Sequence, residues 1–147
     1  MPKQKVLFIC VRNSARSQMA AAWLNRICPE EFEVHSAGLE PGTINPLAIG
    51  AMREVGVDIS RNQTQSVFDA FVSGELFAYA ITVCSESEAA GCPIFAGVTK
   101  RLYWSFPDPS AFRGTYEERL ERTREIRDQI RVRIESFCEE HCVADKV

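Results

Sequence analysis

Residues 6–10, with the sequence Val-Leu-Phe-Ile-Cys, form a short run in which every side chain is apolar or nearly so. A strand with one face in water alternates apolar and polar residues, so an unbroken run indicates a strand that is covered on both faces. Strands of this kind occur mainly in parallel sheets that carry helices on both sides. The run therefore predicts an α/β fold.

The rest of the chain alternates between helix and strand patterns. Helices are predicted at residues 16–27, 46–56, 65–71 and 115–137, and strands at residues 6–10, 32–36, 77–84 and 98–104. Pro46 suits the first position of a helix, and Thr115 and Glu118 have the spacing of a capping box. This order of elements predicts an open four-stranded parallel sheet with helices on both faces.

Length and composition indicate one domain that spans residues 1–147. The chain is 46% hydrophobic with a net charge of -3, which argues against a non-specific nucleic-acid binder. No run approaches the about 18 apolar residues of a membrane span, and residues 6–10 are too few for a secretory leader. We therefore expect a cytoplasmic monomer with no nucleic-acid or membrane partner, whose six cysteines are thiols.

Cys10 ends the first predicted strand and begins the pattern C-x5-R-S. A tight loop between a strand and a helix turns backbone N–H groups inward, and the helix N-terminus adds about half a positive charge. The fork of Arg16 can bind two oxygens of a tetrahedral anion, and the same positive field favours a cysteine thiolate. We expect Cys10 to be a nucleophile beneath an oxyanion site. The residues expected to form that site are Val11, Arg12, Asn13, Ser14, Ala15, Arg16 and Ser17.

Two side chains of this loop have specific expected roles. Asn13 tolerates the left-handed backbone conformation that closes such a loop, and Ser17 can donate its hydroxyl to the sulfur of Cys10. The alternative interpretation is a buried cysteine at a strand end with an unrelated surface arginine. The context of strand, loop and helix favours the nucleophile.

The loop resembles the active-site loop of low-molecular-weight protein tyrosine phosphatases and of the arsenate reductases that share their fold. Family loops usually have a glycine where this chain has Arg12, which adds a cation near the anion. The resemblance implies that Asp108, which is followed by Pro109, is the general acid that protonates the leaving oxygen. A simple turn is the alternative interpretation of that sequence.

Phosphatase and reductase differ in their second step. Water resolves a phosphocysteine, whereas a second thiolate can attack the sulfur of an arsenic(V)-cysteine adduct, release arsenite and leave a disulfide. Cys84 ends the third predicted strand and therefore lies on the same sheet edge as Cys10, and Cys92 follows eight positions later. The pair, the proline after Cys92 and the position of Trp104 are similar to those of thioredoxin-coupled arsenate reductases.

This second resemblance implies a relay from Cys10 to Cys84 and then to Cys92, with thioredoxin as the reductant of the final disulfide. Arsenate is then the substrate, and phosphate or sulfate are competing oxyanions. Two alternatives stay open. One is a tyrosine phosphatase that uses Cys10, Arg16 and Asp108, and the other is a non-catalytic phosphate or phosphoprotein binder.

We expect no cofactor and no metal ion. Members of the family that bind potassium have carboxylates where this chain has Ala21 and Gln65. Cys138, His141 and Cys142 provide three possible metal ligands, but a plain helix end is favoured over an incomplete site. His35 is expected to be a surface or packing residue, and Cys28 an apolar residue at a helix end.

Overall fold

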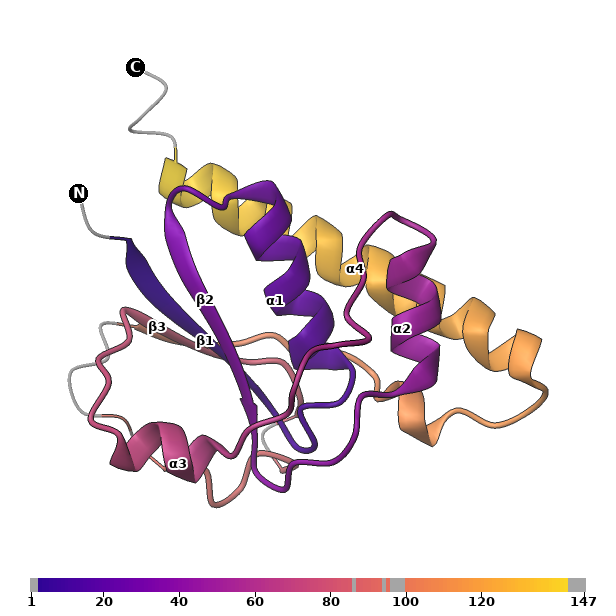
Figure 1. The fold of residues 1–147 in the computed structure, drawn as a ribbon, viewed down its shortest axis with the longest axis horizontal. Helices are drawn as coiled ribbons and strands as arrows, with labels where there is room; N and C mark the ends of the chain where they lie inside the picture. Colours follow the sequence, from indigo (N-terminus) through magenta and orange to yellow (C-terminus); the bar gives the residue numbers. More distant parts are fainter. Residues whose placement is uncertain (1–2, 86, 94, 96–99, 143–147) are drawn as a thin grey trace.

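The computed structural model describes residues 3–85, 87–93, 95 and 100–142. The elements in chain order are β1 (Gln4–Cys10), α1 (Arg16–Ile27), β2 (Phe32–Gly38), α2 (Pro46–Arg53), α3 (Val67–Val72), β3 (Tyr79–Thr82), β4 (Lys100–Tyr103), the 3-10 helix η1 (Pro109–Ala111) and α4 (Tyr116–Cys142). Figure 1 shows α1, α2 and α4 on one face of the sheet and α3 on the other.

The four strands are parallel and lie in the order β2-β1-β3-β4. The predicted fold class is therefore confirmed. Cys10 pairs with Gly38 at the end of β2, and Ile9 pairs with Thr82 at the end of β3. Because all strands run the same way, their carboxyl ends meet at one edge of the sheet, where ligands of such folds bind.

Several element bounds differ from the sequence prediction. α1 begins and ends as predicted, but β3 covers four residues, and α2 ends at Arg53 instead of reaching Gly56. α4 extends five residues beyond Phe137, where Cys138 is buried and the half-buried His141 packs on the Phe137 ring. The ring of His141 lies 4.2 Å from that of Phe137, and its Nδ1 atom is 2.7 Å from the Phe137 carbonyl oxygen. Residues 98–99 of the predicted fourth strand lie outside the described residues.

The capping box of α4 is confirmed. The N–H of Glu118 donates to Thr115 Oγ1 at 3.1 Å, and the N–H of Thr115 donates to Glu118 Oε1 at 3.3 Å. α2 begins with Pro46 at its first position, and the preceding Asn45 accepts a hydrogen bond from the N–H of Leu47. These contacts satisfy N–H groups that have no partner within the helix.

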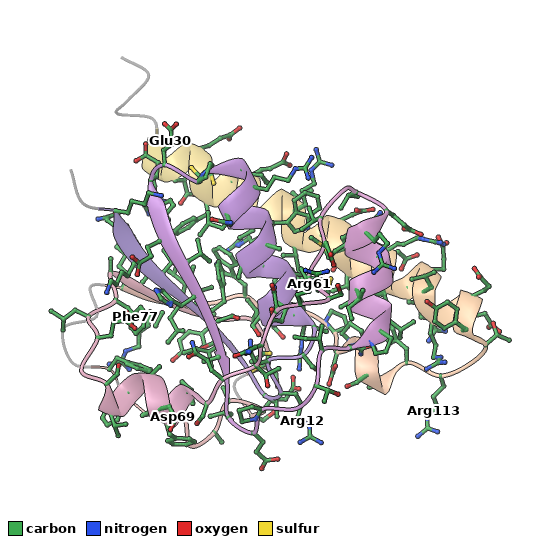
Figure 2. All side chains as sticks on the ribbon, in the orientation of Figure 1. Arg12, Glu30, Arg61, Asp69, Phe77 and Arg113 are labelled. Carbon is green, nitrogen blue, oxygen red and sulfur yellow. The ribbon has the colours of Figure 1, made fainter. Side chains whose placement is uncertain are left out.

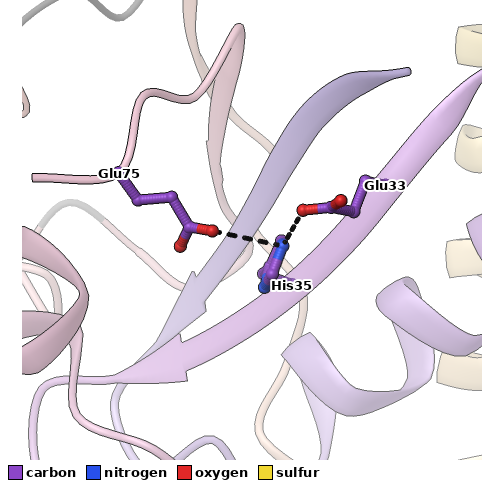
Figure 3. A group of neighbouring side chains, drawn as sticks. All are labelled: Glu33, His35 and Glu75. Carbon is purple, nitrogen blue, oxygen red and sulfur yellow. Dashed lines mark hydrogen bonds and ion pairs between the residues drawn. The ribbon is translucent and has the colours of Figure 1, made fainter. Parts of the chain in front are cut away.

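Side chains fill the space on both faces of the sheet, as Figure 2 shows. On the outer strand β2, His35 is half-buried and packs edge-on against Phe77, with 5.7 Å between ring centroids. Its Nε2 atom is 2.7 Å from Glu33 and 3.9 Å from Glu75 (Figure 3). Lys5 neutralises the two carboxylates at 3.7 and 2.9 Å, so this group is a surface ion-pair network of the chain itself.

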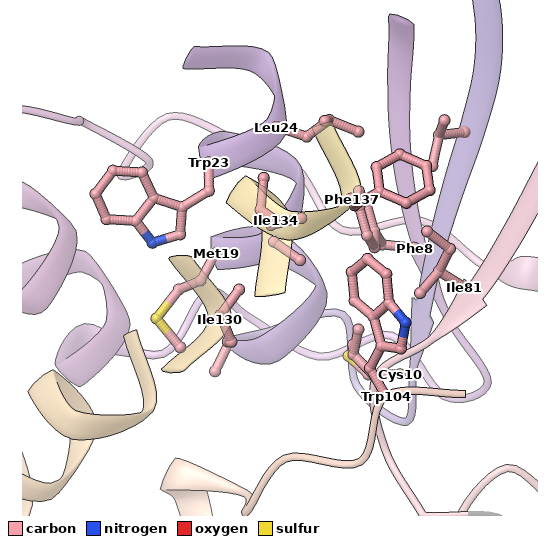
Figure 4. Close-up of a cluster of buried hydrophobic side chains, with 14 of the residues drawn as sticks. Phe8, Cys10, Met19, Trp23, Leu24, Ile81, Trp104, Ile130, Ile134 and Phe137 are labelled. Atoms are coloured by element: carbon pink, nitrogen blue, oxygen red, sulfur yellow. The ribbon is translucent and has the colours of Figure 1, made fainter. Parts of the chain in front are cut away.

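Alternate side chains of β1 enter two different cores. Phe8 and Cys10 face the side of α1 and α4, where they join a cluster that includes Trp104 (Figure 4). Leu7 and Ile9 face the opposite side and pack with α3. This alternation explains why the run of residues 6–10 is apolar throughout. It also places the Cys10 sulfur at the edge of the larger core.

Among the described helices, none has the length and apolar character that crossing a membrane requires.

Candidate active site

The loop after β1 is fixed from outside through its carbonyl groups. Four of them accept hydrogen bonds from backbone N–H groups of the segment after β2: Cys10 from Leu39 at 3.1 Å, Val11 from Glu40 at 2.8 Å, Arg12 from Gly42 at 2.9 Å and Ser14 from Asn45 at 2.9 Å. With these carbonyls held outward, the N–H of Asn13 points inward and lies 3.2 Å from Cys10 Sγ. The loop thus surrounds the thiol and directs a donor at it.

Asn13 and Ser17 form a buried network around the sulfur. Asn13 has a φ of 55°, in the left-handed region, and its side-chain amide donates to Ser17 Oγ at 2.8 Å. Ser17 Oγ lies 2.9 Å from Cys10 Sγ. Because Ser17 accepts from Asn13, its own hydroxyl hydrogen is free to donate to the sulfur. Such a donor stabilises a thiolate more than a thiol.

Gly38, at the end of β2, lies directly against the backbone of the loop after β1. The sequence analysis did not identify this residue. A Cβ there would lie 2.7 Å from Asn13 N, 2.8 Å from the Arg12 carbonyl carbon and 2.8 Å from Val11 O. Because these are backbone atoms, a side chain at position 38 would fit only if the backbone of the loop moved. We expect Gly38→Ala to weaken phosphate binding at least about 10-fold and to cost about 1–3 kcal/mol of stability. Calorimetric titration and urea unfolding measure the two effects.

Gly42→Ala is the matched control for this prediction. A Cβ at Gly42 meets the Cβ of Arg12 at 3.8 Å as its nearest neighbour, which is an ordinary contact. The control should bind phosphate and unfold as the parent protein does. Equal behaviour of the two alanine variants would show that the close approach of Gly38 does not shape the loop.

Arg16 is the polar centre of the site, with a side chain only 3% exposed. Its Nη1 donates to Glu88 Oε1 at 3.2 Å and to the carbonyl of Phe106 at 3.1 Å. Its Nη2 donates to Glu88 Oε2 at 3.1 Å and lies 3.5 Å from Asp108 Oδ2. The hydrogen bond from Arg16 lowers the pKa of Glu88 to about 2. The sequence analysis did not identify Glu88. The sequence feature that could have indicated it is an acidic residue in the segment after β3, the strand next to β1.

Asp108 is half-buried beside Arg16. Its Oδ1 accepts from the N–H of Ser110 at 3.0 Å and from the Ser110 hydroxyl at 2.7 Å, so it caps η1. Its Oδ2 is the atom that approaches Arg16. Asp108 therefore forms the turn that the sequence suggests, and it also lies beside Arg16 of the loop after β1. Trp104 anchors this segment, because it is buried and packs against Phe8 and Phe137.

Cys10 and Cys84 lie on one side of the sheet, and Cys92 lies on the other. Cys84 follows β3 and is buried in the same cluster as Cys10. Burial raises the pKa of Cys84 to about 12; the charge of Cys10 adds to the rise, and Arg16 opposes it. Cys92 is half-buried against the other cluster, with Leu7 and Ile9, and burial raises its pKa as well. The structure brings Cys10 and Cys84 together and holds Cys92 apart.

Arg12 leaves the loop on its outer side. The side chain is 58% exposed and lies 3.7 Å from Glu40, and Figure 2 shows it pointing away from the ribbon. The backbone of Arg12 lies outside the left-handed region. The backbone at this position therefore does not require a glycine.

The chain is similar to known proteins in both sequence and fold. The family model described as low molecular weight phosphotyrosine protein phosphatase matches residues 5–145. An arsenate reductase of Bacillus subtilis is 38% identical over 139 residues, which are 95% of this chain and 98% of that protein. A solved arsenate reductase in the phosphate binding state has a TM-score of 0.75 at 28% identity, over 93% of this chain and 98% of the other. A thioredoxin-dependent arsenate reductase of Corynebacterium glutamicum has a TM-score of 0.72 at 29% identity, over 98% of this chain and 64% of that longer one.

Proposed function

This chain belongs to the low molecular weight phosphotyrosine protein phosphatase family, and from that premise we propose that it reduces arsenate to arsenite with thioredoxin as the reductant. The observation that carries the proposal is the placement of Cys84 in the same buried cluster as Cys10, with a third thiol eight residues further on. A hydrolytic phosphatase needs the first thiol alone. A reductase needs all three.

In the first step the Cys10 thiolate attacks arsenic, and one arsenate oxygen leaves as water. The N–H of Asn13 and the hydroxyl of Ser17, at 3.2 and 2.9 Å from the sulfur, hold the thiolate in place before the attack. Arg16 balances the charge of the oxyanion, and Asp108 donates the proton to the departing oxygen. The product is an arsenic(V)-cysteine adduct.

In the second step Cys84 attacks the sulfur of Cys10. The S–As electron pair passes to arsenic, which leaves as arsenic(III) arsenite, and a Cys10–Cys84 disulfide forms. The pKa of Cys84, at about 12, keeps it protonated in the free protein. Of the charges that act on Cys84, Arg16 lowers its pKa and so favours the thiolate form that attacks.

In the third step Cys92 attacks the Cys84 sulfur and releases the Cys10 thiolate. The resulting Cys84–Cys92 disulfide takes two electrons from the dithiol of thioredoxin, which returns both thiols. Each cycle thus converts one arsenate to arsenite at the expense of one thioredoxin dithiol. We place this chemistry in the cytoplasm, on a monomer, with phosphate or sulfate as competitors for the oxyanion site.

The test is arsenite release in the presence of thioredoxin, thioredoxin reductase and NADPH. We expect one NADPH to be consumed for each arsenite formed, and hydrolysis of a small aryl phosphate to be slower. The aryl phosphate assay is needed because Cys10, Arg16 and Asp108 would equally support a phosphatase. Dominant phosphate release without NADPH consumption would favour that alternative, and binding of phosphate without either reaction would favour a non-catalytic binder.

A further inference from the structure

Glu88 occupies the part of Arg16 that an oxyanion needs. The two terminal nitrogens of Arg16 carry four N–H bonds, and they meet four acceptors: two oxygens of Glu88, the carbonyl of Phe106 and the carboxylate of Asp108. Arg16 is nearly inaccessible to solvent, so few other positions are open around it. A tetrahedral anion that accepts hydrogen bonds from both terminal nitrogens of Arg16 has to displace an acceptor, and the Glu88 carboxylate is the acceptor that is hydrogen-bonded to both.

The same carboxylate also organises the segment that joins the relay cysteines. The N–H of Ser85 donates to Glu88 Oε1 at 3.1 Å, and the N–H of Glu88 donates to Ser85 Oγ at 3.2 Å. The turn continues with Ala89 N to Ser85 O at 3.0 Å and Cys92 N to Ala89 O at 3.0 Å. Glu88 therefore links the position of Arg16 to the turn that ends at Cys92.

We propose that Glu88 is an internal substitute for the substrate oxyanion, and that binding of the oxyanion displaces it from Arg16 and releases the turn that Ser85 forms with residues 87–92. The relay part of this inference rests on the proposed function, whereas the displacement requires only that an oxyanion binds at Arg16. Release is needed because Cys92 is packed against the cluster of Leu7 and Ile9, on the far side of the sheet from Cys84. Glu88 thus acts as a positioning residue that keeps the relay closed until the site is filled.

Displacement by an anion fits the charges better than protonation does. Glu88 is ionised throughout the neutral range, because the hydrogen bond from Arg16 lowers its pKa to about 2. Together with Asp108, it already places two carboxylates on one guanidinium. Binding a further anion without release would place the oxyanion and the Glu88 carboxylate on the same two terminal nitrogens of Arg16. Exchange of Glu88 for the oxyanion avoids placing both anions there.

The experiment uses inorganic phosphate as the probe and the full-length reduced protein. In the parent protein, saturating phosphate is expected to raise the rate of Cys92 alkylation by iodoacetamide about 5-fold or more, as tandem mass spectrometry of the labelled peptide measures. In Glu88→Gln the rate should be high already and independent of phosphate. Phosphate should bind Glu88→Gln about 3- to 10-fold more tightly, because no internal anion competes.

Glu40→Gln is the matched control, since it removes one negative charge beside the loop, at Arg12, without a contact to Arg16. Its Cys92 alkylation should keep the parent's dependence on phosphate. A parent protein whose Cys92 labelling ignores phosphate, or a Glu88→Gln variant with unchanged phosphate affinity, would overturn the proposal. If Glu88→Gln unfolds, Glu88→Asp keeps the charge but shortens its reach, and it should show a weakened phosphate dependence.

The two proposals fail separately. Phosphate-dependent labelling of Cys92 in a protein that releases no arsenite would support the displacement and contradict arsenate reduction. Arsenite release with phosphate-independent labelling would do the reverse.

Discussion

Replacing Cys10 with serine is expected to abolish arsenate reduction and aryl phosphate hydrolysis together, with losses of at least about 10⁴-fold in each. A serine hydroxyl is protonated at neutral pH and is a weak nucleophile where no base is placed to activate it. Ser17 and the N–H of Asn13 stabilise a negative charge on the atom at position 10, but neither removes a proton from it. A serine oxygen also cannot enter a disulfide, so the redox step has no substitute. Arsenite release and nitrophenol release measure the two activities.

Two controls make this result specific. Cys10→Ser keeps Arg16 and the loop backbone, so it should still bind phosphate, which separates loss of the nucleophile from loss of the loop. Cys84→Ser should divide the two activities, because it removes the attacking thiol of the second step and leaves aryl phosphate hydrolysis in place. Survival of either activity in Cys10→Ser would mean that the nucleophile lies elsewhere.

The sheet and the conformation of the loop after β1 could be predicted because their determinants are local in the sequence. The apolar run of residues 6–10 indicates a strand that is buried on both faces. In the structure its side chains enter two separate hydrophobic clusters, one on each face of the sheet. The limits of α1 follow from helix-forming residues and a proline. Asn13 could be assigned a left-handed conformation because few other side chains tolerate it, and its φ is 55°.

The contacts of Arg16 and the position of Cys92 could not be predicted, since they depend on segments far apart in the chain. The Arg16–Glu88 pair joins residues 72 positions apart, and surface glutamates are too common to suggest it. The need for a glycine at position 38 comes from the close approach of the end of β2 to the loop after β1, which no local sequence pattern indicates. Cys92 follows an irregular turn, where the alternation that assigns faces to strand residues does not apply.

Replacing Cys92 with serine is the second decisive change, and it is expected to stop the reaction after one turnover. The Cys10 and Cys84 sulfurs lie in one cluster, so the adduct should still form and release one equivalent of arsenite. The Cys10–Cys84 disulfide then has no internal thiolate to resolve it. Because both of its cysteines are at most 2% exposed, thioredoxin cannot reach it readily. Steady-state turnover should fall about 100-fold or more.

Arsenite per protein molecule, measured after an acid quench, distinguishes one turnover from many. Non-reducing mass analysis should show the disulfide, and the reduced variant should hydrolyse aryl phosphate as the parent does. Cys28→Ser is the matched control, because Cys28 follows α1 and belongs to no step of the relay. Sustained turnover by Cys92→Ser would mean that thioredoxin reduces the first disulfide directly. In the proposed relay Cys92 has to reach Cys84 from the cluster on the opposite side of the sheet, so its loss should leave the buried disulfide unresolved after a single turnover.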